Sequence, residues 1–336
     1  MPETPLLQIE DLVVEFPTRA GLVRAVDGVS LTLGRGERLG IVGESGSGKS
    51  VLGRTVMGLN DRARARISGR VLFEGKDVLG ASAKERRELW GRQISMIFQD
   101  PLSALHPITP IGAQIAEAVR RLPDVDKAQA AERAVELLDM VGIPDARRRA
   151  RQRAHEFSGG MRQRALIAMA IACKPKLIIA DEPTTALDVT VQAKILDLLD
   201  ELCTELSIGS VLITHDMGVV AQHTDQVAVM YGGQVVETAP VAGLFAAPTM
   251  RYTRALLAAI PQMAPGRRAL PVPIGGTPPN PLDRGAGCRF APRCTFAEDD
   301  CHQAIPELLP LADSPDHRYR CWHPAAVPAE TEAGAR

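Results

Sequence analysis

The sequence predicts an α/β fold with a largely parallel sheet, and three observations support this fold class. Short apolar runs typical of buried strands alternate with helical segments through most of the chain. One of these runs leads through a glycine-rich loop into a helix, and another ends in two carboxylates. The 336 residues are 45% hydrophobic and 24% charged, which is the composition of a globular protein with large cores.

The expected elements follow in chain order. Residues 7–16 and 25–33 predict two opening strands. A short apolar run at 38–43 predicts a buried strand that enters a turn, and residues 49–59 after that turn favour a helix. The remaining expected elements are strands at 71–74, 94–98, 177–180 and 210–214, a helical insertion at about 102–172 with an arginine-rich interruption at 145–153, a helix at about 189–206, and a hairpin at 226–237 around Gly232 and Gly233.

Charge and hydropathy exclude several classes of protein. The 39 basic and 40 acidic residues give a net charge of −1, so no global attraction to nucleic acid or anionic lipid is expected. The longest uninterrupted apolar run, residues 165–173, is far shorter than the roughly 20 residues of a membrane-spanning helix. The first residues lack the basic and apolar regions of a signal peptide. We therefore expect a cytosolic protein without nucleic acid as a partner.

Residues 43–50 read Gly-Glu-Ser-Gly-Ser-Gly-Lys-Ser and fit the pattern of a phosphate-binding loop. Glycines allow successive backbone N–H groups to face one anion, and the N-terminus of the following helix attracts the same charge. A plain glycine-rich turn is the alternative, but the expected strand before the loop and helix after it favour nucleotide binding. We expect Gly43, Ser45, Gly46, Ser47, Gly48, Lys49, Ser50 and Val51 to contact the nucleotide, with Ser50 also on Mg²⁺.

A second motif, Asp181 and Glu182, ends the apolar run that starts at Leu177. A buried strand here delivers its acids to the carboxyl edge of the sheet, where α/β folds bind ligands. Asp181 suits Mg²⁺ binding, and Glu182 is placed to polarise a water that attacks the γ-phosphate. The alternative is a solvated acidic pair, which the nearby phosphate loop disfavours.

A third motif lies between these two, where residues 157–164 read Phe-Ser-Gly-Gly-Met-Arg-Gln-Arg. Ser-Gly-Gly at the start of a helix resembles the signature motif of ATP-binding cassette (ABC) ATPases, although Phe157 and Met161 depart from the commonest form, Leu-Ser-Gly-Gly-Gln. The resemblance covers about residues 7–260. The other matching positions are Gln99 (Q-loop), Ala186, Leu187 and Asp188 (D-loop), His215 (switch histidine) and Phe16 (the aromatic residue that stacks on adenine, or alternatively a core residue).

The resemblance implies a P-loop NTPase cassette with a RecA-like mixed sheet core, an N-terminal antiparallel β-subdomain and a helical subdomain inserted at about 102–172. It implies that Glu182, His215 and Gln99 act in catalysis, and that Gln99 also binds Mg²⁺. In such cassettes two subunits enclose ATP. Ser158, Gly159, Gly160 and Asp188 are accordingly expected at nucleotide-binding positions, the first three acting on ATP of the other subunit.

The end of the chain differs from its body. Thirteen of the 25 prolines and four of the six cysteines lie from Pro261 onward. Residues 252–261, 274–281 and 287–294 are similar to the C-terminal extension of dipeptide and oligopeptide importer ATPases. Residues 157–164 and 179–190 also resemble that subfamily, specifically its D-type subunit. We therefore expect a nucleotide-binding domain at 1–262 and an extension at 263–336.

The four cysteines of this extension, Cys288, Cys294, Cys301 and Cys321, follow the spacing C-x5-C-x6-C-x19-C. Structural zinc sites favour closer pairs, and ferredoxin clusters also have tighter spacings. The resemblance implies a [4Fe–4S] cluster, with zinc and free thiols as the alternatives. Cys173 and Cys203 are expected in helix cores, and the histidines His302, His317 and His323 are expected to be solvated.

By resemblance, such a subunit hydrolyses ATP to power peptide uptake from a peripheral position at the cytoplasmic face of the inner membrane. Its implied partners are a second ABC ATPase in a heterodimer, two transmembrane permeases and an extracytoplasmic peptide-binding protein. Related machinery imports nickel, glutathione or oligosaccharides, and these substrates stay open. A soluble ABC ATPase acting on nucleic acid or protein, and an electron-transfer role for the cysteines, are further alternatives.

Overall fold

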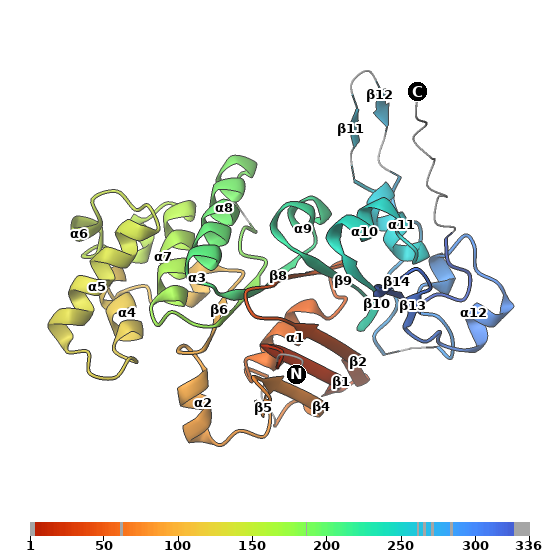
Figure 1. The fold of residues 1–336 in the computed structure, drawn as a ribbon, viewed down its shortest axis with the longest axis horizontal. Helices are drawn as coiled ribbons and strands as arrows, with labels where there is room; N and C mark the ends of the chain where they lie inside the picture. Colours follow the sequence, from red (N-terminus) through yellow and green to blue (C-terminus); the bar gives the residue numbers. More distant parts are fainter. Residues whose placement is uncertain are drawn as a thin grey trace.

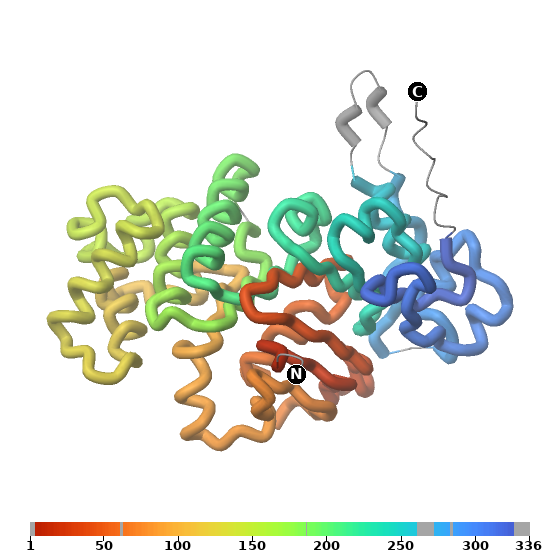
Figure 2. Tube along the Cα trace, viewed as in Figure 1, coloured from red at the N-terminus to blue at the C-terminus, as the bar shows by residue number. Residues whose placement is uncertain are grey.

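The computed structural model describes residues 4–60, 63–185, 187–260, 262–264, 267–269, 272–282 and 285–325, and two large sheets organise them. In the view of Figure 1 the smaller sheet lies below the central sheet, a helical region lies at the left, and the C-terminal end of the chain lies at the right. Figure 2 shows the same path as a tube, with the helical region in yellow and green and residues 285–325 in blue.

The central sheet has eight strands in the order β13-β14-β10-β9-β3-β8-β7-β6. The strands from β9 to β6 are parallel to one another, so their carboxyl ends meet at one edge. The strands β3, β7 and β8 are apolar and almost wholly buried, as expected for strands covered on both faces. The bounds are β3 Arg38–Val42, β6 Ile94–Ile97, β7 Leu177–Asp181, β8 Gly209–Thr214, β9 Gln226–Tyr231 and β10 Gln234–Pro240.

The second sheet is antiparallel, with the strand order β2-β1-β4-β5. Its apolar side chains share one core with strands of the central sheet and with the helix α1 (Lys49–Val56). The bounds are β1 Leu7–Thr18, β2 Gly21–Leu33, β4 Arg66–Phe73 and β5 Lys76–Asp77.

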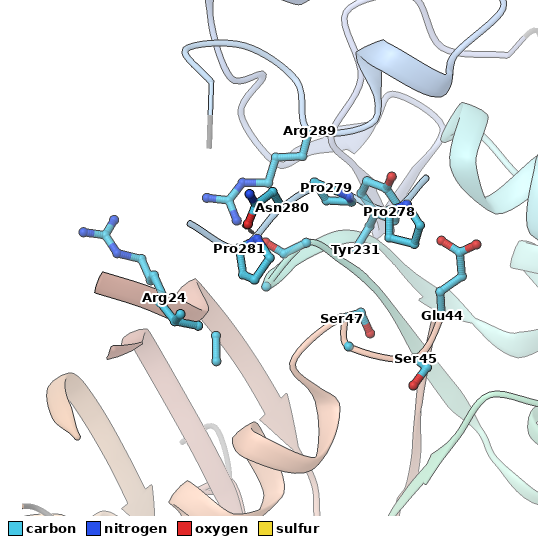
Figure 3. Close-up of a pocket in the computed structure, with 15 residues that line it drawn as sticks. Arg24, Glu44, Ser45, Ser47, Tyr231, Pro278, Pro279, Asn280, Pro281 and Arg289 are labelled. Atoms are coloured by element: carbon cyan, nitrogen blue, oxygen red, sulfur yellow. Dashed lines mark hydrogen bonds between the residues drawn. The ribbon is translucent and has the colours of Figure 1, made fainter. Parts of the chain in front are cut away.

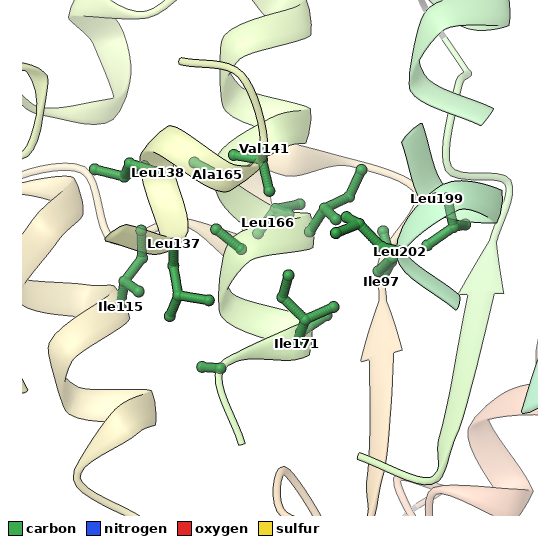
Figure 4. Close-up of a cluster of buried hydrophobic side chains, with 14 of the residues drawn as sticks. Ile97, Ile115, Leu137, Leu138, Val141, Ala165, Leu166, Ile171, Leu199 and Leu202 are labelled. Atoms are coloured by element: carbon green, nitrogen blue, oxygen red, sulfur yellow. The ribbon is translucent and has the colours of Figure 1, made fainter. Parts of the chain in front are cut away.

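The helical region packs around a separate apolar cluster (Figure 4), in which Leu137 and Leu138 of one helix meet Leu166 of a second and Leu199 of a third. Asp126, at the start of the first of these helices, forms a capping box with Gln129. The bounds are α3 Pro101–Ala104, α4 Ile111–Val119, α5 Lys127–Met140, α6 Ala146–Arg149, η1 Ala154–Glu156, α7 Gly159–Ile171 and α8 Val189–Glu205. The helix α2, Ala83–Leu89, lies apart from this region, and its Leu89 is buried in the core of the antiparallel sheet.

The C-terminal segment, which here means residues 272–282 and 285–325, continues the central sheet through strand β14. Glu237 and Thr238 of β10 lie opposite Tyr319 and Arg318 of β14, respectively. The bounds of the elements after β8 that are not given above are α9 Met217–His223, α10 Val241–Ala246, α11 Arg251–Ala258, β11 Gln262–Ala264, β12 Arg267–Ala269, η2 Ala291–Arg293, α12 Asp299–Gln303, β13 Leu309–Leu311 and β14 Ser314–Tyr319.

An aromatic cluster joins the C-terminal segment to the body. The ring of Phe290 lies 5.4 Å from the rings of both Tyr231 and Tyr252, measured between centroids. All three side chains are buried in one apolar core with residues of β9, β10 and α11. The C-terminal segment therefore shares a core with the central sheet.

The elements expected from the sequence agree with the structure, apart from some boundaries. The strand expected at 25–33 begins at Gly21, the helix expected at 49–59 ends at Val56, and the arginine-rich interruption contains the short helix α6. Gly232 and Gly233, with φ of 54° and 85°, form the two-residue turn of the expected hairpin. Cys203 is buried on α8 as predicted, and burial raises its pKa to about 12. Cys173 is buried as predicted, but it lies just after α7, which ends at Ile171.

The expectation that His317 is solvated is wrong. Its side chain is 3% exposed, and its Nε2 lies 2.7 Å from Oε1 of the fully buried Glu237. Glu237 also accepts the backbone N–H groups of Thr249 and Met250, at 2.7 and 3.1 Å. The pairing of β14 with β10 brings the two side chains together, and that pairing has no signal in the local sequence.

Among the described residues, no helix combines the length and apolar character that crossing a bilayer requires.

Replacing Glu237 with alanine tests this buried contact. Glu237→Ala leaves two backbone N–H groups and His317 without their acceptor, so we expect the free energy of unfolding to fall by about 3–5 kcal/mol. Asp316→Ala, on the same strand as His317 but exposed, is the control and should change it by less than about 0.5 kcal/mol. Urea denaturation followed by circular dichroism measures both, and equal stabilities would contradict this account.

Candidate functional site

The glycine-rich loop joins β3 to α1 at the carboxyl edge of the central sheet. Close contacts with neighbouring backbone require glycine at two of its positions. Gly43 and Gly48 have φ of 153° and 102°, values that disfavour residues with a side chain. A Cβ at Gly43 would lie 2.1 Å from the carbonyl oxygen of Met230, and one at Gly48 would lie 2.2 Å from that of Ala25. The loop is therefore pressed against β9 on one side and β2 on the other.

Lys49 folds back across this loop. Its ammonium donates hydrogen bonds to the carbonyl oxygens of Gly43 and Glu44, at 2.8 and 3.0 Å. Burial lowers the pKa of Lys49, while the carboxylates of Glu182, Asp181 and Glu44 raise it. The residue is 5% exposed, so its charge is held in the concave face of the loop, where phosphate oxygens would bind.

Ser50 and Asp181 form the part of the site that suits a magnesium ion. The Ser50 hydroxyl donates to Oδ1 of Asp181 at 2.7 Å. Oδ2 of Asp181 is buried and has no hydrogen-bond partner among the described residues. Burial raises the pKa of Asp181, and the hydrogen bond from Ser50 lowers it. A hydroxyl beside an unsatisfied carboxylate oxygen is a donor set that Mg²⁺ and its waters fit.

Glu182 lies directly after the buried Asp181 but faces the cleft. Its φ of 46° turns the chain out of the strand, and its side chain is 17% exposed. Its Oε2 accepts hydrogen bonds from Gln99 at 3.0 Å and from Thr185 at 2.8 Å, and its Oε1 lies 3.4 Å from Nδ1 of His215. Three strand ends, those of β6, β7 and β8, thus bring Gln99, Glu182 and His215 into contact.

A cleft of about 620 Å³ collects most of the residues predicted from the sequence. It is open to solvent and runs between the loop, the end of β7 and His215. Ala25 of β2 and Leu256 of α11 also line it, and no sequence motif marks either residue. The lining residues are Ala25, Gly43, Glu44, Ser45, Gly46, Gly48, Lys49, Ser50, Val51, Gln99, Glu182, His215 and Leu256.

Phe16 is not among the described residues that line this cleft. It is half-buried on β1, opposite Val23 of β2, and packs against the core shared by the two sheets. Val23 lines a second cavity of about 150 Å³, which shares Ala25 and residues 44–46 with the cleft. Figure 3 shows this cavity between the phosphate loop and the C-terminal segment. That cavity is closed by Arg289 and by residues 278–281 of the C-terminal segment, which the sequence did not place near the loop.

Ser158, Gly159 and Gly160 begin α7, away from the cleft of their own chain. Ser158 caps the helix by accepting the N–H of Met161 at 3.3 Å. A Cβ at Gly160 would come within 2.9 Å of Val191 in α8, so the two helix starts pack closely. Asp188 caps α8 in the same way, through the N–H of Val191 at 2.9 Å. Ala186, the first residue of the expected D-loop, lies outside the described residues.

The four cysteines of the C-terminal segment lie in one region of the fold. Burial raises the pKa of Cys288 and that of Cys321, the latter to about 11, and neighbouring cysteines add to both increases. Backbone N–H groups act in the opposite direction. Phe290 and Ala291 direct theirs at the sulfur of Cys288, and Arg251 and His323 direct theirs at the sulfur of Cys321.

Burial is the larger effect at both sulfur atoms and favours the protonated thiols, and the N–H donors aimed at sulfur oppose it only in part. The single group of described residues that could hold one ion is Asp300, Cys301 and His323, whose ligand atoms lie within 4.8 Å of one another.

Comparisons with known proteins match both parts of the chain. The family described as ABC transporter matches residues 26–185, and the family described as oligopeptide/dipeptide transporter, C-terminal region, matches residues 236–301. The dipeptide transport ATP-binding protein of Escherichia coli is 46% identical over 319 residues, which are 95% of this chain and 97% of that protein. The oligopeptide transport ATP-binding protein of Bacillus subtilis is 45% identical over 330 residues, 97% of this chain and 92% of that protein.

Solved structures share the fold. One is a dimeric ATP-binding cassette in a post-hydrolysis state, bound to ADP and inorganic phosphate. It is 25% identical with a TM-score of 0.63, over 70% of this chain and 98% of that one.

Replacing Gly48 with alanine tests the steric account of the loop. The Cβ would meet the carbonyl oxygen of Ala25, so we expect the loop to shift and affinity for a fluorescent ATP analogue to fall at least about tenfold. The control is Gly36→Ala, in the turn before β3. Gly36 also has a positive φ, of 67°, where a side chain costs about 1–2 kcal/mol, but a Cβ there meets no atom within 4 Å. Equal affinities for the two variants would contradict the proposed constraint.

Proposed function

Because this chain belongs to the ABC transporter family of ATP-binding proteins, we propose that it is the ATP-hydrolysing subunit that powers uptake of dipeptides or oligopeptides through a multi-subunit importer. Identities of 45–46% with dipeptide and oligopeptide transport ATP-binding proteins, over nearly their whole lengths, carry this conclusion. The match of residues 236–301 to the C-terminal region of such transporters supports the peptide substrate. In this proposal residues 1–262 form the nucleotide-binding domain and residues 263–336 form its extension.

The geometry of the cleft supports a role for each residue in ATP hydrolysis. Backbone N–H groups of the loop and the ammonium of Lys49 hold the β- and γ-phosphates. Ser50, Asp181 and Gln99 hold Mg²⁺, which neutralises phosphate charge when bound. Glu182 accepts a proton from the attacking water. His215 and Gln99, both close to Glu182, sense the γ-phosphate and orient that water.

The exposed N-termini of α7 and α8 support a dimer. Ser158, Gly159 and Gly160 present a helix N-terminus to solvent, and the nearby Val189 is 83% exposed despite its apolar side chain. A second ABC subunit placed against this face would cover Val189 and receive donors from Ser158 and the glycines on its ATP. We assign the partner as a different ATPase, giving a heterodimer, with Asp188 at the same interface.

A groove beside Gln99 supports docking of permeases. It has a volume of about 650 Å³ and lies between β6 and the helices α4 and α7, with Trp90, Phe98 and Met169 in its walls. Apolar residues around it are exposed, Leu102 to 58% and Ile108 to 73%. A helix from a permease would bury these side chains. Two permeases would then hold the protein at the cytoplasmic face of the inner membrane, below an extracytoplasmic peptide-binding protein.

The four cysteines Cys288, Cys294, Cys301 and Cys321 hold a [4Fe–4S] cluster in this proposal, with zinc as the alternative. The N–H groups directed at the sulfur atoms of Cys288 and Cys321, and the mutual influence of the cysteines on their pKa values, support the assignment. A cluster would cross-link the C-terminal segment, which contains few strands and helices of its own.

Glu182→Gln separates binding from hydrolysis. The amide keeps the shape of the side chain but cannot accept the proton, so ATP affinity should stay unchanged while turnover falls at least about a hundredfold. Glu201→Gln, an exposed position on α8, is the matched control. ATP hydrolysis and uptake of a labelled dipeptide by the transporter reconstituted in liposomes measure the effect. Substantial residual turnover would refute the assignment of the base, and uptake of nickel, glutathione or an oligosaccharide in place of peptide would refute the substrate.

The metal content of the purified chain tests the cluster. Anaerobically purified protein should contain iron and acid-labile sulfide in a ratio of about one to one, as in a [4Fe–4S] cluster. Cys301→Ser should lower both, whereas Cys203→Ala, a core position outside the segment, should lower neither. Zinc without sulfide would establish the alternative, and absence of both metals would exclude a metal role for these cysteines.

A further inference from the structure

We propose that Arg293, in the C-terminal segment, is a positioning residue for the phosphate loop, because it neutralises and holds the carboxylate of Glu44. This inference rests on the nucleotide site of the proposed function. Arg293 and Glu44 are 249 residues apart, and Glu44 is the second residue of the loop. The two side chains form a bidentate pair, with Nη1 2.6 Å from Oε2 and Nη2 3.0 Å from Oε1.

The guanidinium is fully satisfied in this position. Besides the two bonds to Glu44, it donates to the Tyr231 hydroxyl at 3.2 Å and to the carbonyl oxygens of Gly275 and Ile274 at 2.8 and 3.3 Å. All five of its N–H groups therefore have an acceptor. The Arg293 side chain is only 4% exposed, so the arginine is fixed by surrounding structure and is not a mobile surface charge.

The backbone of Glu44 is held from a second side. Its N–H donates to the hydroxyl of Tyr252 at 3.0 Å, and the ring of Tyr252 packs 4.4 Å from that of Tyr231. In Figure 3 the Glu44 side chain extends away from Ser45 and Ser47. The carboxylate is thus drawn toward the C-terminal segment while the rest of the loop faces the cleft.

The charge of the Glu44 carboxylate affects the binding of ATP. The Glu44 carboxylate is near enough to Lys49 to raise the pKa of that ammonium, so it also acts on phosphates bound there. An unpaired carboxylate at this position would repel the triphosphate. The Arg293 guanidinium pairs it, and the hydrogen bonds to Glu44 raise the pKa of Arg293 further, which keeps it charged.

Variants at the two positions should shift ATP affinity in opposite directions. Arg293→Gln leaves Glu44 negative, and we expect the Kd of the full chain for Mg-ATP to rise about five- to tenfold. Glu44→Gln leaves Arg293 positive, and the Kd should fall. The double variant removes both charges and should return the Kd to within about twofold of the wild type. In the assembled transporter Arg293→Gln should raise KM for ATP with little change in kcat.

The controls separate this account from a loss of folding. Arg318→Gln, an exposed arginine of the same segment on β14, should leave the Kd unchanged. Circular dichroism of Arg293→Gln should match that of the wild type, because adding Glu44→Gln also removes an uncompensated charge and could rescue folding and affinity together. An unaltered Kd in Arg293→Gln, or a loss that persists in the double variant, would overturn the proposal. If the wild type does not bind Mg-ATP, or binds it equally well after Lys49→Ala, the proposed function fails instead.

Discussion

The close approach of the phosphate loop to the two strands beside it is the constraint on which the rest of the site depends. Gly43 and Gly48 lie so near the carbonyl oxygens of Met230 and Ala25 that no Cβ fits at either position. Met230 belongs to the central sheet and Ala25 to the antiparallel sheet. Both sheets therefore confine the loop, whose shape turns its N–H groups toward one anion.

The end of β7 shows how one strand provides two carboxylates with different environments. Asp181 is 1% exposed and bonded to Ser50, whereas Glu182 leaves the strand with a positive φ and meets Gln99, Thr185 and His215. A buried acid with one unsatisfied oxygen suits a cation, and a partly exposed acid in a cleft suits proton transfer from water. The single change in backbone direction at Glu182 separates the two roles.

Local patterns predicted the core of this fold because burial and turn chemistry act over a few residues. The apolar run of β7 and the Gly232-Gly233 turn of the hairpin are of this kind, and both lie where expected. The sequence pattern does not distinguish a Phe16 that stacks on adenine from a Phe16 that packs in the core, because a half-buried aromatic residue on a strand is compatible with both roles.

Contacts between distant segments left no such signal. The pairing of β14 with β10, which buries His317 against Glu237, follows from the whole sheet order. Arg293 lies between Cys288 and Cys294 in the sequence, and only the cysteines were recognised there as candidate functional residues. Nothing within its neighbourhood in the chain indicates that its partner is Glu44 of the phosphate loop.

The hairpin of β9 and β10 connects these distant parts physically. Its turn touches the loop directly, since the N–H of Gly233 donates to the carbonyl oxygen of Ser47 at 3.0 Å. The carbonyl oxygen of the adjacent Gly232 accepts a hydrogen bond from Arg289 of the C-terminal segment. One turn therefore contacts the phosphate loop on one side and the cysteine-bearing segment on the other. A rearrangement of that segment would move the turn and Arg293 together, and both contacts end on the same loop. The C-terminal segment is thus part of the scaffold of the nucleotide site.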